Sequence, residues 1–293
     1  MGGPGRRLRE LIAGGETVLA GGCYDPLTAK LAERLGFEAA YLGAGTVGYA
    51  LNVTEAMITV TEMATAIRQI TQKTRIPLIV DGATGFGEPL HTMRTVREYE
   101  RAGAAAIEIE DQIVPKRAHH HKGVEHLVPL EAMVDKVKAA VAAREDADFI
   151  IIARTNGVRN EGVPQAIERG RAYRAAGADM IVVAGRTRQE VELLHRGIGA
   201  PLVMFVMPGR LESLNATVKD MARLGYPLLL DPHVALVSAF RAIRDTMREL
   251  KETGKTSLDP ATVTAIMQEI NETVDLPDYW RLEEMTVEKP ARS

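Results

Sequence analysis

The feature that most constrains the fold is a unit that recurs along the chain, in which a helix-like stretch ends at a glycine and runs into a short apolar segment. Four copies are LGFEAAYLG at 35–43, AGAAAIEIED at 102–111, AGADMIVVAG at 176–185 and LGYPLLLDP at 224–232. A glycine just past a helix supplies the left-handed C-cap, and unbroken apolar runs are typical of parallel strands buried on both faces. Each unit therefore predicts one helix followed by one parallel strand.

Further apolar runs bring the number of predicted strands to eight. They are TVLAGGC at 17–23, IPLIVDG at 76–82, DFIIIART at 148–155 and APLVMFVM at 200–207. Segments between the strands, such as 95–103 and 130–146, carry apolar residues three and four apart, which is the helical period. Eight strands alternating with helices over about 250 residues predict a (β/α)₈ TIM barrel. The alternative is a doubly wound open sheet, but the chain has no GxGxxG phosphate loop after its first strand.

Residues 254–293 form a C-terminal extension with a different pattern. A helix is predicted at 258–274, because Asp259 is a suitable N-cap and Pro260 suits the first turn. The helix predicted at 233–252 already completes the outer ring of a barrel, so the apolar side of the tail helix needs another partner. We expect one barrel domain over 1–293 whose extension packs on a neighbouring subunit of a homo-oligomer. The alternative is a helix that closes the bottom of the barrel.

Composition excludes several classes of partner. Lys and Arg number 36 and Asp and Glu number 39, and the formal net charge of −3 argues against nucleic acid, which requires a concentrated positive surface. No apolar run approaches the roughly 20 residues of a membrane helix, and the basic N-terminus lacks the apolar stretch of a secretory signal. The single cysteine, Cys23, excludes a disulfide framework within the chain. We therefore expect a cytoplasmic protein with neither a nucleic-acid nor a membrane partner.

Polar residues stand at the C-terminal ends of the predicted strands, where a TIM barrel carries its active site. Asp81 ends the third strand, Glu108 and Glu110 end the fourth, and Arg154 ends the fifth. The other polar or small residues at these ends are Gly43, Ala44, Gly45, Thr46, Asp111, Asn156, Arg186 and Asp231. Carboxylates beside a fixed cation suit Mg²⁺ or Mn²⁺ holding an anionic substrate. The sequence therefore predicts a metal site that binds a small acid.

Two loops at the same end of the barrel have compositions suited to binding. The turn at 43–45 consists of small residues that let a ligand approach the backbone and its amide donors. Residues 112–129 form a connection longer than its structural task requires, and such loops are often lids. This loop carries four histidines, two lysines and an arginine, which suit an anionic substrate. A zinc site is not expected, because consecutive histidines rarely point at one centre.

Three ordered motifs carry a resemblance to a known family: VDGATGFG at 80–87, RTVREYERAGAAAIEIEDQIVPKRAHH at 94–120 and FIIIARTNG at 149–157. With these motifs the chain resembles the isocitrate lyase and phosphoenolpyruvate mutase superfamily, nearest its 2-methylisocitrate lyase-like branch. The resemblance implies a Mg²⁺-dependent TIM-barrel enzyme that forms or cleaves C–C or P–C bonds beside a 2-oxo or 2-hydroxy carboxylate. It also implies a homotetramer whose last helix is exchanged between subunits.

The resemblance assigns roles to residues of the barrel mouth. Asp81 and Glu110 match the metal-site acids of the family, and Glu55 stands where many members have an aspartate. Arg154 matches the arginine that holds the substrate carboxylate. Gly43, Ala44 and Gly45 match a substrate-binding turn that has lost its hydroxyl.

The family's lid motif Lys-Arg-Cys-Gly-His is matched by Lys116, Arg117 and His120. The same resemblance shows where this chain departs from the family pattern. Ala118 stands where the lyases have their catalytic cysteine. The other departures are Ala83, which replaces a second metal-site aspartate, and Ala184 and Phe205, which replace a glutamate and an asparagine.

These residues predict a metal-dependent C–C lyase acting on a small 2-hydroxy or 2-oxo di- or tricarboxylic acid. Arg154 would fix a carboxylate, and the metal with the amides of the 43–45 turn would stabilise the enolate left by C–C scission. His120 or water would return the proton, because Ala118 has no thiol. Three alternatives stay open: an oxaloacetate-type decarboxylase, a phosphonate mutase or hydrolase, and a non-catalytic protein that binds a small acid.

Overall fold

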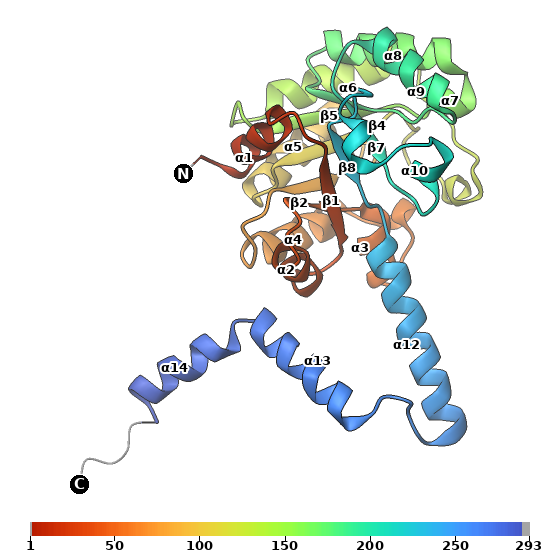
Figure 1. Cartoon of the computed structure of the whole chain (residues 1–293). Helices are drawn as coiled ribbons and strands as arrows, with labels where there is room; N and C mark the ends of the chain where they lie inside the picture. Colours follow the sequence, from red (N-terminus) through yellow and green to blue (C-terminus); the bar gives the residue numbers. More distant parts are fainter. Residues whose placement is uncertain (1, 289–293) are drawn as a thin grey trace. The chain divides into compact units, whose positions relative to one another are not determined.

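The chain comprises two compact units, Met1–Val234 and Ala235–Ser293, and the computed structural model describes residues 2–288. The first unit is a closed barrel of eight parallel strands in chain order (Figure 1). The strands are β1 Val18–Cys23, β2 Ala39–Leu42, β3 Leu78–Asp81, β4 Ala106–Glu110, β5 Ile150–Arg154, β6 Met180–Val182, β7 Leu202–Phe205 and β8 Leu228–Leu230. Pairing of β1 with β8 closes the barrel. The predicted TIM barrel is confirmed, and each strand lies within one of the predicted apolar runs.

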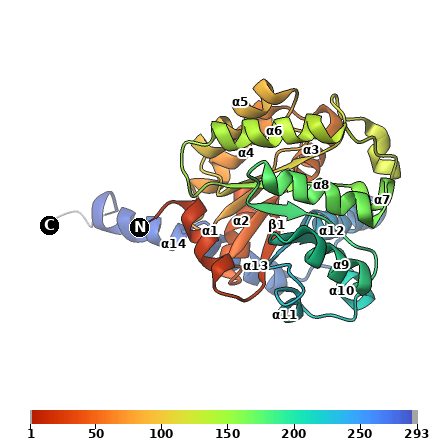
Figure 2. The same cartoon turned by 90° about the horizontal axis from the view of Figure 1, so that it is seen from above.

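Helices connect the strands and surround them, as the view from above shows (Figure 2). The helices of the first unit are α1 Pro4–Ala13, α2 Pro26–Arg34, α3 Ala44–Ala50, α4 Val60–Thr71, α5 Pro89–Arg101, α6 Leu130–Ala143, α7 Gly157–Asn160, α8 Val163–Ala175, α9 Arg188–Ile198, α10 Arg210–Ser213 and α11 Val218–Met221. Two 3₁₀ helices, η1 Glu55–Met57 and η2 Ala118–Lys122, lie in the loops after β2 and β4.

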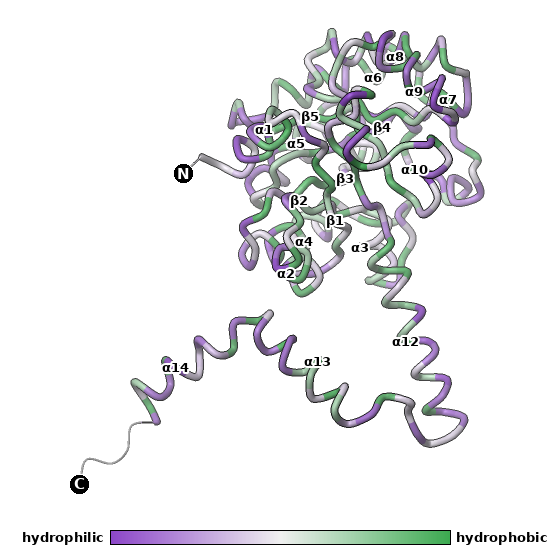
Figure 3. Tube along the Cα trace, in the orientation of Figure 1, coloured by the Kyte–Doolittle hydropathy of each residue, from purple (hydrophilic) through white to green (hydrophobic). Residues whose placement is uncertain are grey.

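The apolar core has two layers, one inside the barrel and one between the strands and the helices. The strands are correspondingly hydrophobic in Figure 3. Leu8 of α1 is fully buried and packs with Val18, Ala39 and Ile150, which begin or nearly begin their strands. Helix α1 therefore fills the N-terminal end of the barrel.

The second unit contains α12 Val234–Thr253, of which Val234 belongs to the first unit, α13 Pro260–Thr273 and α14 Leu276–Thr286. The predicted helix start at Asp259 is confirmed, because its side chain accepts a hydrogen bond from the Thr262 amide at 3.0 Å. The helix predicted at 233–252 is confirmed as α12, whereas its place in the outer ring stays a prediction. In the part of the chain described, α12 has no buried residue, and its apolar side chains lie exposed, Phe240 by 65% and Met247 by 66%. Within residues 2–288, no helix has the length and apolar character needed to cross a bilayer.

Candidate active site

The ends of β3, β4 and β5 bring three carboxylates and an arginine together inside the barrel mouth. In the strand register Asp81 lies beside Glu108, and Glu110 lies beside Arg154. Because side chains alternate along a strand, Glu108 and Glu110 share the inner face of β4. Arg154 Nη1 donates to Glu108 Oε1 at 3.0 Å, and Arg154 Nε lies 3.6 Å from Glu110 Oε2. The predicted convergence of acids from the third and fourth strands with Arg154 is present.

Arg154 is held from two further sides that sequence reasoning missed. Its guanidinium lies 4.8 Å from the centroid of the Phe205 ring, a cation–π contact. Its partner Glu108 also accepts a hydrogen bond from Tyr41 Oη at 3.2 Å, and the Tyr41 and Phe205 rings meet edge to face with centroids 5.6 Å apart. The alternation of side chains along β4 could have predicted that Glu108 faces Arg154. No local sequence pattern predicts the contact between Tyr41 and Phe205. The guanidinium is thus fixed in one orientation before any ligand arrives.

Asp81 ties two loops to the mouth. Its Oδ1 accepts from the Ala83 amide at 2.7 Å, and its Oδ2 accepts from the Ala44 amide at 3.2 Å. Asp81 therefore already binds one of the amides predicted to meet the substrate, that of Ala44, which begins helix α3 rather than lying in a turn. Ala83 itself has φ 47°, a left-handed conformation that is strained for alanine. Strain of this kind is found where a site requires a particular backbone path.

The long loop 112–129 covers the mouth. Its base is a short antiparallel ladder in which the Ile113 amide donates to the His126 carbonyl and the Val128 amide to the Asp111 carbonyl, both at 2.9 Å. Its tip is η2. Between them Lys116 Nζ contacts both Glu55 and Glu110, and only 6% of the Lys116 side chain is exposed. The loop therefore delivers a cation into the acidic cluster, as the lid interpretation requires.

His120 enters the same cluster as a cation. Its Nδ1 lies 2.8 Å from the Arg117 carbonyl and its Nε2 lies 3.1 Å from Glu55 Oε2. A carbonyl and a carboxylate can only accept, so both ring nitrogens must carry a proton. The hydrogen bond to Glu55 accordingly raises the pKa of His120. Burial opposes the charge of Glu55, but the hydrogen bond from His120 and the charge of Lys116 lower its pKa to about 2.

Other candidate residues have exposed side chains. Arg117 is exposed and contributes its carbonyl, and Ala118 and Ala184 are exposed. Arg186 is exposed and pairs with Glu190 at 3.7 Å.

Asp111 was expected at the mouth with Glu110, and this was wrong because the next residue of a strand faces the other way. Its carboxylate points toward α8, accepting from Tyr173 Oη at 2.9 Å and lying 3.5 Å from Arg169 Nη1. It also accepts from the Asn156 amide at 3.1 Å, and the Asn156 side chain donates to Glu110 Oε2 at 3.1 Å. Asp111 therefore supports the mouth from behind.

The donor set of the mouth fits a divalent cation. Four buried or nearly buried carboxylates, those of Glu55, Asp81, Glu108 and Glu110, are faced by three cations, those of Lys116, Arg154 and His120. Negative charge remains in excess, and burial together with the charges of Glu55 and Glu108 raises the pKa of Asp81 to about 8. Hard carboxylate oxygens with uncompensated charge suit Mg²⁺. Within residues 2–288, however, no three side chains of metal-ligating type already surround one point.

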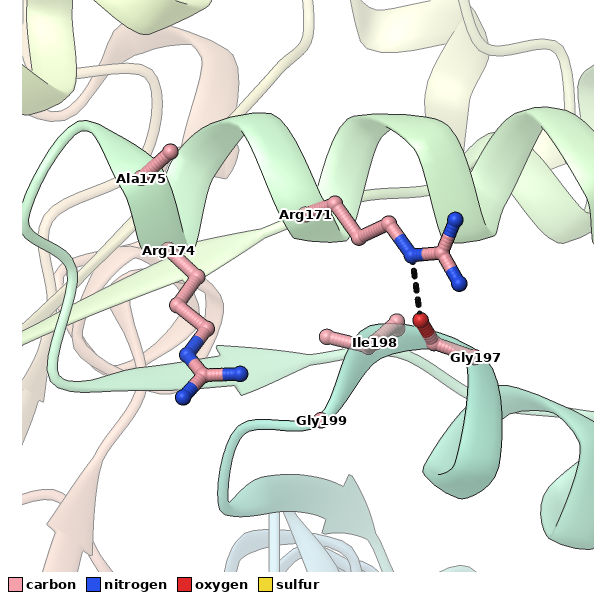
Figure 4. A pocket seen from close by; sticks show the side chains of 6 residues that line it. All are labelled: Arg171, Arg174, Ala175, Gly197, Ile198 and Gly199. Carbon is pink, nitrogen blue, oxygen red and sulfur yellow. Dashed lines mark hydrogen bonds between the residues drawn. The ribbon is translucent and has the colours of Figure 1, made fainter.

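A cavity of about 500 Å³ lies between the C-terminal ends of α8 and α9 (Figure 4). Arg171 and Arg174 line it with residues 197–199, and Arg171 Nε donates to the Gly197 carbonyl at 2.5 Å. These helix ends lead into the starts of β6 and β7, at the face of a TIM barrel that serves stability. The arginines compensate the carbonyl ends of two helices there. We do not assign this cavity a role in catalysis.

Comparison with known proteins decides the family. A family model described as phosphoenolpyruvate phosphomutase matches residues 8–251. The chain belongs to the phosphoenolpyruvate mutase family. The 2-methylisocitrate lyase of Aeropyrum pernix is 41% identical over 254 residues, covering 86% of this chain and 81% of the relative. The 2,3-dimethylmalate lyase of Eubacterium barkeri is 38% identical over 86% of this chain and 87% of the relative. An oxaloacetate decarboxylase of Chromohalobacter salexigens is 34% identical over 90% of this chain and 91% of its own length.

Solved structures of the superfamily share the fold of this family member. A crystal structure of 2,3-dimethylmalate lyase has a TM-score of 0.86 at 27% identity, covering 97% of this chain and 96% of the other. Phosphonopyruvate hydrolase in complex with oxalate and Mg²⁺ has a TM-score of 0.84 at 29% identity, covering 98% and 100%. The predicted resemblance to the isocitrate lyase and phosphoenolpyruvate mutase superfamily is confirmed.

Proposed function

We propose that this protein is a Mg²⁺-dependent C–C lyase that cleaves a small 2-hydroxy or 2-oxo carboxylic acid. The observation that carries the proposal is the buried cluster of Asp81, Glu110 and Arg154 beneath a loop that inserts Lys116. The named lyases among the relatives, and the Mg²⁺ and oxalate bound by a structural neighbour, support the same reaction class. Mn²⁺ would serve the same oxygen ligands.

Asp81, Glu110 and Glu55 are the residues that would hold the cation, and Lys116 is the counter-ion of both glutamates. When bound, the cation supplies Lewis-acid stabilisation of the negative charge that C–C scission leaves on the substrate. Arg154, fixed by Glu108 and Phe205, binds and orients the substrate carboxylate. Gly43 is the N-cap of α3, and the first residues of this helix, Ala44 and Gly45, border this space beside Asp81 and Glu55.

The lid residues exclude water and balance charge. Lys116 brings a positive charge to the reacting acid, and Arg117 adds a further one at the exposed side of the lid. His120 carries a proton on each ring nitrogen, so it is the titratable group of the lid able to protonate the enolate. Its Nε2 proton faces Glu55, and reaching the substrate requires that contact to loosen.

Decarboxylation of an oxaloacetate-like acid is the second candidate. Ala118 supports it, because the lid has an alanine where the lyases have a catalytic cysteine and an enolate formed by loss of CO₂ can take its proton from a less specialised donor. Relatives named oxaloacetate decarboxylase support it as well.

We further propose that the enzyme is a homotetramer in which residues 254–293 extend one barrel domain and pack on a neighbouring subunit. Apolar residues along α12 support this, because each is more than half exposed: Val237, Phe240, Ile243, Met247 and Leu250. Their spacing of three and four residues makes one continuous stripe, which is typical of a helix that packs on another helix.

The test is turnover of a panel of acids with Mg²⁺ and with a chelator in its place. Methylisocitrate, 2,3-dimethylmalate, oxaloacetate and phosphonopyruvate separate the lyase, decarboxylase and phosphonate activities by their products. We expect release of a 2-oxo acid from a hydroxy acid, dependent on Mg²⁺ and lost in Arg154→Met. Turnover of none of these acids by a folded protein would contradict the proposal.

A further inference from the structure

The tip of the lid is fastened by a side chain that none of the steps above uses. His121 Nδ1 lies 3.2 Å from Tyr49 Oη, and His121 Nε2 lies 2.8 Å from Thr54 Oγ1. Tyr49 belongs to α3, and Thr54 immediately precedes Glu55 and η1. Both nitrogens of one imidazole thus bind the segment that carries Glu55.

The chemistry of these three groups suits a clasp. A neutral imidazole has one donor and one acceptor nitrogen, and each hydroxyl can take either role, so both contacts are made without a charge. The ring of His121 also lies against the ring of His120, with centroids 3.9 Å apart. Holding His121 therefore fixes the orientation of the residue that meets Glu55.

We propose that His121 is a positioning residue that clasps the lid shut through Tyr49 and Thr54 and so keeps Lys116 and His120 within the mouth, beside Glu55. Its effect on turnover rests on the proposed function, whereas its effect on the lid does not. The chain supplies a matched control in His119, which lies in the same 3₁₀ helix and for which no side-chain hydrogen bond is found in the described part of the chain.

The first measurement is trypsin cleavage of the full-length protein after Arg117 and Lys122, both exposed in the lid. Each rate is divided by the rate for a peptide of residues 112–129 with the same substitution. Loss of two exposed hydrogen bonds in His121→Ala should speed cleavage roughly threefold to tenfold. His119→Ala should match the wild type. A wild-type rate for His121→Ala, or an equal increase for His119→Ala, overturns the clasp.

Variants of the two hydroxyl partners test the contact directly. Tyr49→Phe and Thr54→Val should each speed cleavage, whereas Thr54→Ser, which keeps the hydroxyl, should restore the wild-type rate. Tyr49→Phe should add nothing in a protein that already carries His121→Ala, because the two residues share one contact. Full additivity in this double variant overturns the proposed bridge.

The second measurement links the clasp to the reaction. With an acid that the wild type turns over, His121→Ala should lower kcat in proportion to the loss of the closed lid, a smaller factor than in proteolysis, which follows the open state, and should leave Mg²⁺ affinity unchanged. An opened lid with unchanged kcat overturns the positioning role. If no acid is turned over, the proposed function fails, and the proteolysis series alone decides whether the clasp exists.

Discussion

Asp81 shows how the environment of one residue shapes this site. Burial and two neighbouring carboxylates raise its pKa to about 8, although two backbone amides donate to it. The amides orient the carboxylate, and the missing charge partner is what a divalent cation supplies. Ala83, two residues further on, donates one of these amides. By the family resemblance it stands where relatives have a second metal-site aspartate.

Ala83→Asp tests this deficit of ligands. Asp tolerates the left-handed conformation better than Ala, so its backbone should accept the change. The added charge should lower the thermal stability of the metal-free protein and enlarge the rise in Tm on adding Mg²⁺. Ala83→Asn, of similar size but neutral, is the control. Equal Mg²⁺-induced shifts in both variants would count against a metal site here.

Much of the site could be predicted at this scale, and the misses have physical reasons. Asp81, Glu110, Arg154 and Lys116 were predicted from strand ends and motifs, and they meet. The environment of Arg154 was missed, because the contact of Phe205 on β7 with a β5 side chain depends on barrel closure and has no local signal. Asp111 was misplaced although the two-residue period of β4 already predicts that it faces outward.

At the scale of elements, the loop 112–129 depends on contacts at both ends. Its tip meets the segment around Glu55, and its base is held by Asp111, whose carbonyl accepts from Val128 and whose carboxylate meets Tyr173 of α8. Glu125 adds a third contact, since the Asn160 side chain of α7 donates to it at 3.1 Å. The loop could be predicted as a lid from its length and composition. The contacts that hold it could not, because their partners lie far away in the sequence.

Tyr173→Phe should destabilise the protein by about 1 kcal/mol, because a buried carboxylate loses a hydrogen-bond donor. Tyr99→Phe is the matched control. Tyr99 is a fully buried tyrosine of α5, and its hydroxyl has no hydrogen-bond partner within residues 2–288. Urea unfolding of the two variants gives the comparison. Equal losses of unfolding free energy would show that the Asp111 contact contributes nothing of its own.

At the scale of the whole molecule, the eight strands were predicted in order because each glycine-ended helix and apolar run is a local pattern. The role of α1 at the N-terminal end of the barrel was missed, because the sequence of an amphipathic helix does not indicate which surface it packs on. Helix α12 was predicted only as the last helix of the outer ring, and the exposure of its apolar side was not predicted. A single sequence shows that a helix has an apolar side but not which surface packs against that side.

Deleting residues 257–293 should lower the mass of the assembly and reduce solubility, because apolar surface on the partner subunit becomes exposed. Sedimentation velocity measures the first effect. Ile266→Glu with Met267→Glu, at half-exposed apolar positions of α13, should act in the same direction, whereas Gln268→Glu on the same helix should not. An unchanged sedimentation coefficient in the double variant would rule out α13 as part of an interface.

We expect the mouth of this barrel to hold a small acid through a divalent cation and Arg154. Calorimetric titration with oxalate, the ligand present with Mg²⁺ in the phosphonopyruvate hydrolase neighbour, tests it most directly. Oxalate should bind the wild type only when Mg²⁺ is present, and Asp81→Asn and Arg154→Met should each abolish binding while circular dichroism stays unchanged. Equal oxalate binding with a chelator in place of Mg²⁺, or undiminished binding by Asp81→Asn, would show that no cation holds the acid in this mouth.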